Sequence, residues 1–103
     1  KKDCHHGITA TACGFYGPQG RELRLKAAVK GLNEKLTAFN HNGLKVTNFE
    51  METSALFGLS KSLGHEASTV CAIIANRILK QFSKDYKKTV NNLIEKTLQD
   101  LTR

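Results

Sequence analysis

Residues 44–63 read LKVTNFEMETSALFGLSKSL, and within this stretch a strand pattern changes into a helix pattern. Residues 44–51 alternate between apolar and polar side chains, which predicts a strand. From Glu52 to Leu63 the apolar residues recur at helical spacing, so we expect a helix that ends at Gly64 in a left-handed conformation. We expect its buried face to hold Ala55, Leu56, Leu59 and Leu63. A strand that passes directly into a helix is typical of α/β proteins.

Two further strands are expected on either side of this stretch. Residues 7–13 are small or β-branched and are bounded by glycines, which predicts a buried strand. Residues 68–75 contain a continuous apolar run, which predicts a third strand buried on both faces, as in a parallel sheet covered by helices. Three such strands leave unpaired edges and little core, so we expect other strands upstream of Lys1.

Two more helices complete the predicted strand–helix alternation. Apolar residues at helical spacing predict the first at residues 32–39, with a stop at Asn40–Gly43. The second is expected to begin at a Ser83 cap and to run to about Leu101. Its apolar face holds Tyr86, Val90, Leu93, Ile94 and Leu101. The predicted fold class is therefore α/β.

The composition indicates an ordinary folded protein. The chain has 103 residues, of which 40% are hydrophobic and 24% charged, so we expect one domain rather than a disordered chain. No apolar run reaches the roughly 18 residues that a membrane helix needs, so we expect no membrane partner. The net charge is +7, but the basic excess is divided between residues 1–31 and 78–103. We therefore favour a solvated basic surface over a non-enzymatic nucleic-acid-binding module, which stays an alternative.

The three cysteines indicate the cellular compartment. Cys4, Cys13 and Cys71 are odd in number and lack metal-type spacing, which argues against a disulfide framework. We therefore expect a reducing, cytoplasmic location. Cys4-His5-His6 offers metal-binding side chains, but adjacent residues cannot all reach one ion and no second cluster completes a site. No metal site is expected.

The loop at residues 14–21 follows the first predicted strand and is a candidate binding site. In open α/β sheets, ligands bind beyond the carboxyl ends of the strands. The loop supplies an aromatic ring, an amide and a guanidinium in Phe15, Gln19 and Arg21, which suit a flat heteroaromatic ligand with carbonyl and imide edges. The alternative is a surface turn in which Phe15 plugs the core and Arg21 is solvated.

Two other strand ends carry charged residues. Glu50 and Glu52 lie two apart, so both carboxylates can face one site, where they could accept sugar hydroxyl protons or stabilise positive charge. The helix dipole explains an acidic residue at Glu52 but explains Glu50 less well. Asn76 and Arg77 end the third predicted strand. Three strand ends with such side chains indicate one shared site.

Four segments resemble the uridine branch of the nucleoside phosphorylase family. They are GITATA at 7–12, FYGPQGR at 15–21, NFEMETSA at 48–55 and IANR at 74–77. The resemblance implies a mixed-sheet α/β sandwich, incomplete in this chain, with residues 1–103 as a single C-terminal fragment of one domain. The family binds phosphate with residues from the first part of its chain, and this sequence holds none of them.

The resemblance also implies roles for individual residues. Gln19 and Arg21 would bind the uracil carbonyls and imide, and Phe15 would pack on the nucleoside. Glu52 would accept the ribose 2′-hydroxyl, with Met51 packing on the sugar. The remaining residues implied at the site are Glu50 beside Glu52, Ile73 and Ile74 lining the base pocket, and Arg77 near O4 of uracil. Arg21 and Glu52 are the residues implied in catalysis.

The implied reaction is reversible phosphorolysis of uridine to uracil and ribose 1-phosphate, a pentosyl transfer in pyrimidine salvage. It takes phosphate as co-substrate and needs no metal or organic cofactor, in an enzyme that forms homodimers or hexamers. A purine nucleoside phosphorylase or nucleosidase is the nearest alternative, although purine-specific relatives carry an aspartate where Asn76-Arg77 stands. Hydrolysis by a pyrimidine nucleosidase is left open.

Overall fold

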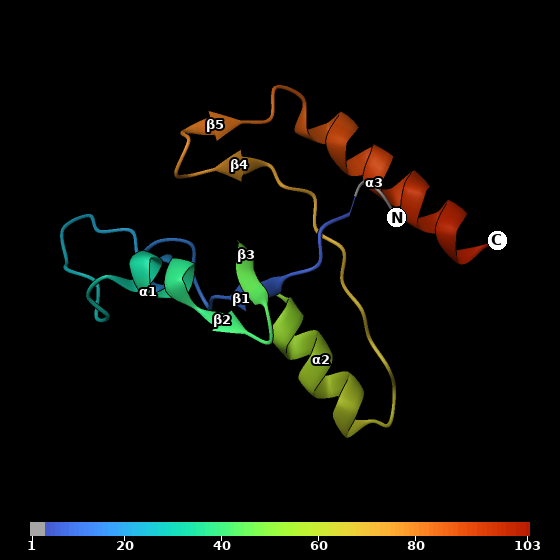
Figure 1. Ribbon diagram of the computed structural model, residues 1–103, viewed down its shortest axis with the longest axis horizontal. Coiled ribbons are helices and arrows are strands. Elements are labelled where there is room, and N and C mark those ends of the chain that lie inside the picture. The colour runs from blue at the N-terminus through green and yellow to red at the C-terminus, as the bar shows by residue number, and fades with distance from the viewer. Residues whose placement is uncertain (1–3) are drawn as a thin grey trace. The chain divides into compact units, whose positions relative to one another are not determined.

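A computed structural model describes residues 4–103. The chain is mixed α/β, with three α-helices and short strands in the described part, and it divides into two compact units at residues 67 and 68. Unit 1 contains β1 (Ile8–Thr11), α1 (Leu32–Ala38), β2 (Asn40–His41), β3 (Leu44–Glu50) and α2 (Thr53–Ser62). Unit 2 contains β4 (Ala75–Asn76), β5 (Gln81–Phe82) and α3 (Tyr86–Leu101). Figure 1 labels these elements.

The sheet of unit 1 has the order β1-β3-β2. β1 and β3 are parallel, as the sequence predicts, and Thr11 pairs with Glu50 at their carboxyl ends. The register shifts between Ile8 and Thr9, where Thr47 is the extra residue on β3. A Cβ atom at Gly7 would lie 2.2 Å from the Thr47 Cγ2 atom, so the close approach of the two strands requires glycine there.

A hairpin precedes β3 where the sequence predicts only a helix stop. β2 pairs antiparallel with the start of β3 through Asn40–Lys45 and His41–Leu44. The two turn residues, Asn42 and Gly43, have φ angles of 52° and 82°, which is the left-handed backbone that two-residue hairpins need. The Asn42-Gly43 pair was therefore the sequence signal for a hairpin. Because β2 is antiparallel and β1 is parallel to β3, the sheet is mixed.

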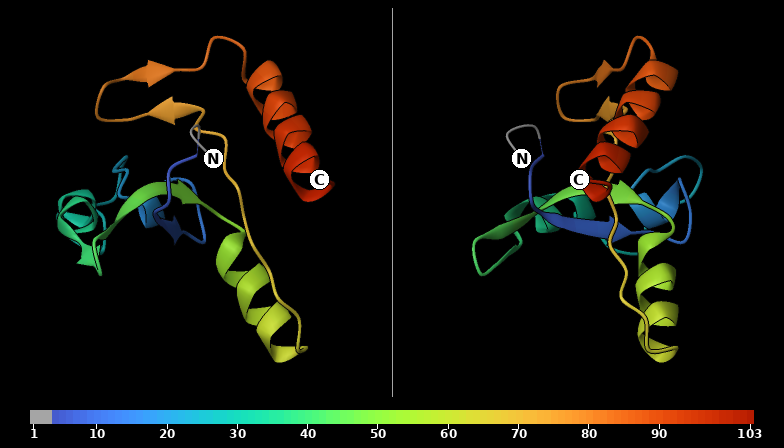
Figure 2. Two further views of the ribbon diagram at one scale, coloured as in Figure 1. Left: turned by 45° about the vertical axis from the view of Figure 1, so that its right-hand side comes forward. Right: turned by 90° about the vertical axis from the view of Figure 1, so that its right-hand side faces the viewer.

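The predicted strand-to-helix change at residues 44–63 is confirmed. Figure 2 shows α2 as the continuation of β3, with a short corner at Met51 and Glu52 between them. The helix ends as expected, because Gly64 adopts a φ of 74° and its N–H donates to the Lys61 carbonyl.

The prediction of a strand at residues 68–75 is wrong. Unit 2 has a two-residue strand, β4, that begins only at Ala75 and pairs antiparallel with β5. Val70 and Ile73 are exposed by more than half, at 53% and 56%. A strand buried on both faces requires neighbouring strands and covering helices, and residues 4–103 give this apolar run neither.

The last helix starts later than predicted. Asp85, and not Ser83, is the cap of α3, because its carboxylate accepts a hydrogen bond of 3.0 Å from the Lys88 N–H. The Ser83 hydroxyl instead forms a hydrogen bond with the Thr89 hydroxyl. The carboxylate offers a stronger acceptor than a hydroxyl at the positive end of the helix.

The expectation of buried helix faces is also wrong. Leu59 and Leu63 of the α2 segment are 64% and 70% exposed, and Tyr86 and Leu101 of α3 are 55% and 77% exposed. The other predicted face residues are exposed or only half-buried. In the described part of the chain only Ala12, Gln19 and Thr53 are buried. The helical periodicity is present, but the apolar faces lack the packing partners that would bury them.

Candidate functional site

Two of the predicted site segments follow the carboxyl ends of adjacent parallel strands. The loop with Phe15, Gln19 and Arg21 comes after β1, and the corner with Met51 and Glu52 comes after β3. The Ala12 N–H donates to the Glu50 carbonyl at 2.9 Å, so the pairing continues to the edge of the sheet. The structure therefore brings the two segments to one end of the sheet in unit 1, where α/β proteins bind ligands.

The loop after β1 folds into a compact turn that holds its polar side chains. A single 3₁₀ turn at Gly17–Gln19 is closed by Gly20, whose φ is 75°. The N–H groups of Gln19 and Arg21 both donate to the Tyr16 carbonyl, at 3.1 and 2.9 Å. These bonds fix the backbone at residues 19 and 21, whose side chains contact each other through a hydrogen bond.

Arg21, Gln19 and Phe15 form one contact cluster. The Arg21 Nη1 atom donates to the Gln19 Oε1 atom at 2.9 Å and to the Phe15 carbonyl oxygen. The guanidinium carbon lies 3.8 Å from the centroid of the Phe15 ring. Gln19 is only 5% exposed. Phe15 is 52% exposed, so it does not plug the core as the surface-turn alternative required.

The corner after β3 is held by Glu50 and not by Glu52. The Glu50 Oε2 atom accepts hydrogen bonds from the N–H groups of Glu52 and Thr53, at 2.7 and 2.6 Å. The Thr11 hydroxyl donates to the Glu50 Oε1 atom. Glu50 thus caps the start of α2, which corrects the expectation that the helix dipole explains Glu52 but not Glu50.

These contacts change the acidity of Glu50. Partial burial disfavours its charged form, but the hydrogen bonds from Thr11, Glu52 and Thr53 outweigh that effect and lower its pKa from 4.5 to about 2. Glu50 is therefore a carboxylate at neutral pH, and its oxygens are directed into the protein.

Glu52 and Met51 lie on the solvent side of the same corner. The Glu52 Oε2 atom accepts one hydrogen bond, of 3.1 Å, from the Met51 N–H. The Glu52 side chain forms no capping bond to α2, and both residues are exposed. The two carboxylates therefore do not share one role: Glu50 holds the backbone, and Glu52 presents its oxygens outward.

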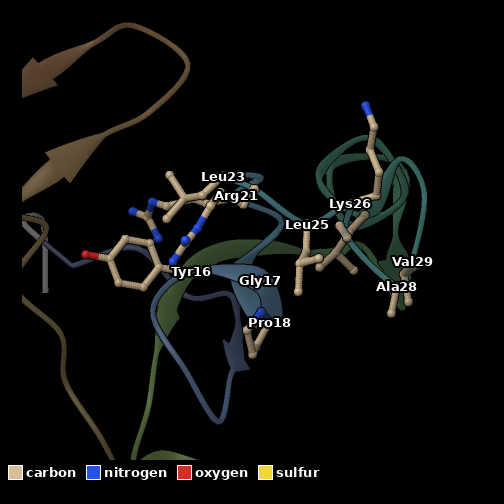
Figure 3. A pocket seen from close by; sticks show the side chains of 12 residues that line it. Tyr16, Gly17, Pro18, Arg21, Leu23, Leu25, Lys26, Ala28 and Val29 are labelled. Carbon is tan, nitrogen blue, oxygen red and sulfur yellow. The ribbon is translucent and has the colours of Figure 1, made fainter.

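A pocket of about 560 Å³ lies beside the loop and is of a size that small ligands occupy. Figure 3 shows Tyr16, Arg21 and Leu23 at one end of it and Ala28 and Val29 at the other. Arg21 is the only predicted site residue in its lining. The pattern of residues 22–30 is ambiguous between a strand and a helix, so sequence analysis did not predict this apolar part of the pocket.

The remaining predicted site residues belong to unit 2. Ile73 and Ile74 precede β4 and are exposed, and Arg77 follows it and is half-buried. They lie in unit 2, so the expectation that they share a base pocket with Gln19 and Arg21 stays a prediction.

No three His, Cys, Asp or Glu side chains gather as metal ligands within residues 4–103. Cys4, Cys13 and Cys71 are free thiols. The helices in this part of the chain are too short or too polar to cross a membrane.

Comparison with known proteins gives one clear relationship. Over 90 residues, 82% of its length, the chain is 39% identical to a uridine phosphorylase of Thermococcus kodakarensis. The chain is similar to part of a uridine phosphorylase. That resemblance, predicted from four segments, is confirmed. No protein-family model matches the chain, and no solved structure does.

The similarity covers 30% of the uridine phosphorylase. It supports a relation to the nucleoside phosphorylases, which are enzymes, and the α/β content of both units is compatible with part of such a fold. Whether residues 1–103 form a single fragment of one domain stays a prediction.

Sequence analysis did not single out Thr11, which contacts the corner after β3. The Thr11 hydroxyl contacts Glu50 and the start of α2, although Thr11 was expected only as part of a buried strand. The alternation of Thr9 and Thr11 with alanines was the available signal, because residues two apart in a strand share one face.

Proposed function

We propose that this chain supplies the nucleoside-binding part of a uridine phosphorylase, an enzyme that converts uridine and phosphate into uracil and ribose 1-phosphate. The observation that carries the proposal is the joint position of the Arg21–Gln19 pair and the Glu52 corner at the carboxyl ends of β1 and β3. The similarity to a uridine phosphorylase supports it. The nucleoside phosphorylase fold is proposed on the same grounds.

The loop after β1 is suited to hold the base. The Gln19 amide oxygen accepts from Arg21 and so orients the guanidinium, and the N–H donors of Arg21 together with the Gln19 amide complement a ring with carbonyl and imide groups. Phe15 offers an exposed aromatic surface for packing on the nucleoside. When the glycosidic bond breaks, the Arg21 cation stabilises the negative charge that develops on the departing uracil.

The corner after β3 is suited to hold the sugar. The exposed Glu52 carboxylate can accept the proton of the ribose 2′-hydroxyl, and Met51 can pack on the sugar. The same carboxylate stabilises positive charge on the sugar ring while the bond to the base breaks. Glu50 acts through the backbone in this proposal, because its oxygens already cap α2. Ile73, Ile74 and Arg77 are assigned to the base pocket.

Phosphate is the nucleophile in the proposed reaction. It attacks the sugar carbon from the side opposite the base, the carbon–nitrogen bond breaks, and uracil leaves with the bonding electrons. Residues outside this chain would bind the phosphate. We assign no metal or organic cofactor to the reaction.

The proposed setting is the cytoplasm, where three free cysteines stay reduced. The proposed assembly is a homodimer or a hexamer. The exposed apolar residues of α2, including Leu59, are suited to contacts within such an assembly.

The experiment that tests the function uses the complete protein that contains this chain. Uridine is incubated with and without phosphate, and uracil and ribose 1-phosphate are measured by chromatography. We expect uracil only when phosphate is present, with ribose 1-phosphate in equal amount.

The other outcomes separate the alternatives. Uracil release without phosphate would indicate a nucleosidase, and turnover of inosine in preference to uridine would indicate a purine-specific enzyme. No turnover of any nucleoside, together with salt-sensitive binding of RNA, would favour the basic binding module.

A further inference from the structure

The Thr11 hydroxyl connects the last residue of β1 to both sides of the corner that carries Glu52. It donates to the Glu50 Oε1 atom before the corner. It accepts a hydrogen bond of 3.1 Å from the Ser54 N–H after the corner. Because the hydroxyl accepts from Ser54, its own hydrogen is free to point at Glu50, so one atom serves both contacts.

Together with Glu50, this hydroxyl satisfies the first N–H groups of the helix. Glu50 accepts from Glu52 and Thr53, and Thr11 accepts from Ser54. The bonds from Thr11 and from the Thr53 N–H to Glu50 are partly buried, and Thr53 itself is only 7% exposed, whereas the bonds from the Glu52 and Ser54 N–H groups are exposed. Met51 and Glu52 project outward from this corner.

We propose that Thr11 is a positioning residue for Glu52: its hydroxyl fixes the corner between β3 and α2, and the corner directs the Glu52 carboxylate at the 2′-hydroxyl of the bound nucleoside. The inference rests on the proposed function, and it adds a specificity-determining residue outside the groups that touch substrate. Without the hydroxyl, the Glu50 Oε1 atom loses the Thr11 donor and the Ser54 N–H loses its acceptor, while the two backbone bonds to the Glu50 Oε2 atom remain. The corner is then held on one side only and is free to shift.

Thr9, two residues before Thr11 and therefore on the same face of β1, offers a matched control. Thr9 pairs with Asn48 in the same parallel ladder, and its hydroxyl donates to the Asn48 Oδ1 atom at 3.0 Å. Thr9 therefore forms the same type of cross-strand bond without touching the corner. A role in sheet stability alone predicts equal effects at Thr9 and Thr11, whereas positioning predicts an effect at Thr11 alone.

The experiment compares kcat/KM for phosphorolysis of uridine and of 2′-deoxyuridine in the complete protein. Thr11→Val keeps the β-branched shape and removes the hydroxyl. We expect a loss of about tenfold or more for uridine, since small misplacements of a positioning group have large effects, and a loss of only about threefold for 2′-deoxyuridine. Thr11→Ser restores the hydroxyl and should stay near the wild-type values for both substrates, and so should Thr9→Val.

The outcomes separate this inference from the proposed function. A wild-type protein that does not phosphorolyse uridine overturns both. If the wild type is active, the positioning role alone is overturned by either of two results. In the first, kcat/KM of Thr11→Val falls equally for uridine and 2′-deoxyuridine; in the second, Thr11→Val has the same kinetics as Thr9→Val. If Thr11→Val does not fold, Thr11→Ser and Thr11→Ala are compared, and an unchanged uridine-to-deoxyuridine ratio in Thr11→Ala overturns the inference.

Discussion

Arg21 stacks on the ring of Phe15, with its guanidinium carbon 3.8 Å from the ring centroid, while its Nη1 atom donates to the Phe15 carbonyl. One residue thus contacts both the side chain and the backbone of another residue six positions earlier. The same nitrogen reaches Gln19. The loop therefore holds its cation in place before any ligand binds, which lowers the ordering cost of binding.

Replacement of this cation should weaken catalysis by the complete enzyme. Arg21→Ala removes the charged donor to the departing uracil. We expect the loss of transition-state stabilisation to be about 2–4 kcal/mol, so kcat/KM for uridine should fall roughly 30- to 1,000-fold. Arg21→Lys keeps the charge but loses the planar group that stacks on Phe15. Its kcat/KM should therefore lie between the values of the wild type and of Arg21→Ala. Steady-state kinetics provide the measurement, and an unchanged kcat/KM in Arg21→Ala would remove Arg21 from the site.

Glu52 should distinguish substrates by their 2′-hydroxyl. Glu52→Gln weakens the acceptor for this hydroxyl, so kcat/KM for uridine should fall more than that for 2′-deoxyuridine, which has no such group to donate. Glu66→Gln, at another exposed glutamate, is the matched control and should leave both values unchanged. Equal losses for the two substrates would argue against a ribose-binding role.

Glu50 should contribute to stability in a pH-dependent way. Its pKa is lowered from 4.5 to about 2 in the folded protein, so its stabilising effect is fully present above pH 4.5 and is lost as the pH falls toward about 2. Glu50→Gln cannot ionise and should show less acid-induced loss of stability within that range. Denaturant unfolding of the complete protein at several pH values checks this, and parallel wild-type and variant curves would contradict it.

The local elements could be predicted from the sequence, because their signals lie within each segment. The alternation in β3, the helical spacing of α2 and the left-handed Gly64 depend on neighbouring residues only. The prediction of a strand at residues 68–75 was wrong because an apolar run indicates only that burial is favourable. It does not indicate which strands or helices would bury the run. Val70 and Ile73 are exposed for that reason.

The candidate site was predicted in part on the same principle. The sequence predicts that three strand ends share one site, and the structure brings two of them, the loop after β1 and the corner after β3, to one end of the same sheet. The roles of Glu50 and Glu52 at the helix start were reversed, because hydrogen-bond geometry decides which of two carboxylates caps the helix. The two-residue spacing of Glu50 and Glu52 predicts only that both side chains lie on the same face of a strand.

The helix cap of α3 can be tested on a peptide of residues 82–103. Asp85→Ala removes the acceptor of the Lys88 N–H and should destabilise the helix by about 1 kcal/mol, which lowers the helicity measured by circular dichroism. Ser83→Ala should have a smaller effect, because the Ser83 hydroxyl contacts Thr89 and no backbone N–H in the first turn. The reverse order of the two effects would restore Ser83 as the cap.

The 103-residue chain on its own should be catalytically silent. Under the proposed function, Arg21 and Glu52 bind a nucleoside beyond the carboxyl ends of β1 and β3. No segment of this chain resembles the residues with which the family binds the attacking phosphate. Without bound phosphate, no nucleophile is held close to the sugar carbon and no negative charge faces the positive charge on the sugar ring. Each of these effects is a major part of the rate enhancement. Mixing the chain with a fragment that carries the rest of the complete protein should restore phosphorolysis.

The same isolated chain should also associate with itself. β1 lies at the edge of its sheet, with no strand on its outer side among residues 4–103, and Leu59 and Leu63 of the neighbouring helix segment are largely exposed. Unpaired strand edges and apolar faces favour pairing between copies. Sedimentation velocity should therefore show dimers or larger species whose proportion rises with concentration. A monomer that converts uridine and phosphate at a rate near that of the complete enzyme would contradict both expectations, and would mean that phosphate binds within these residues.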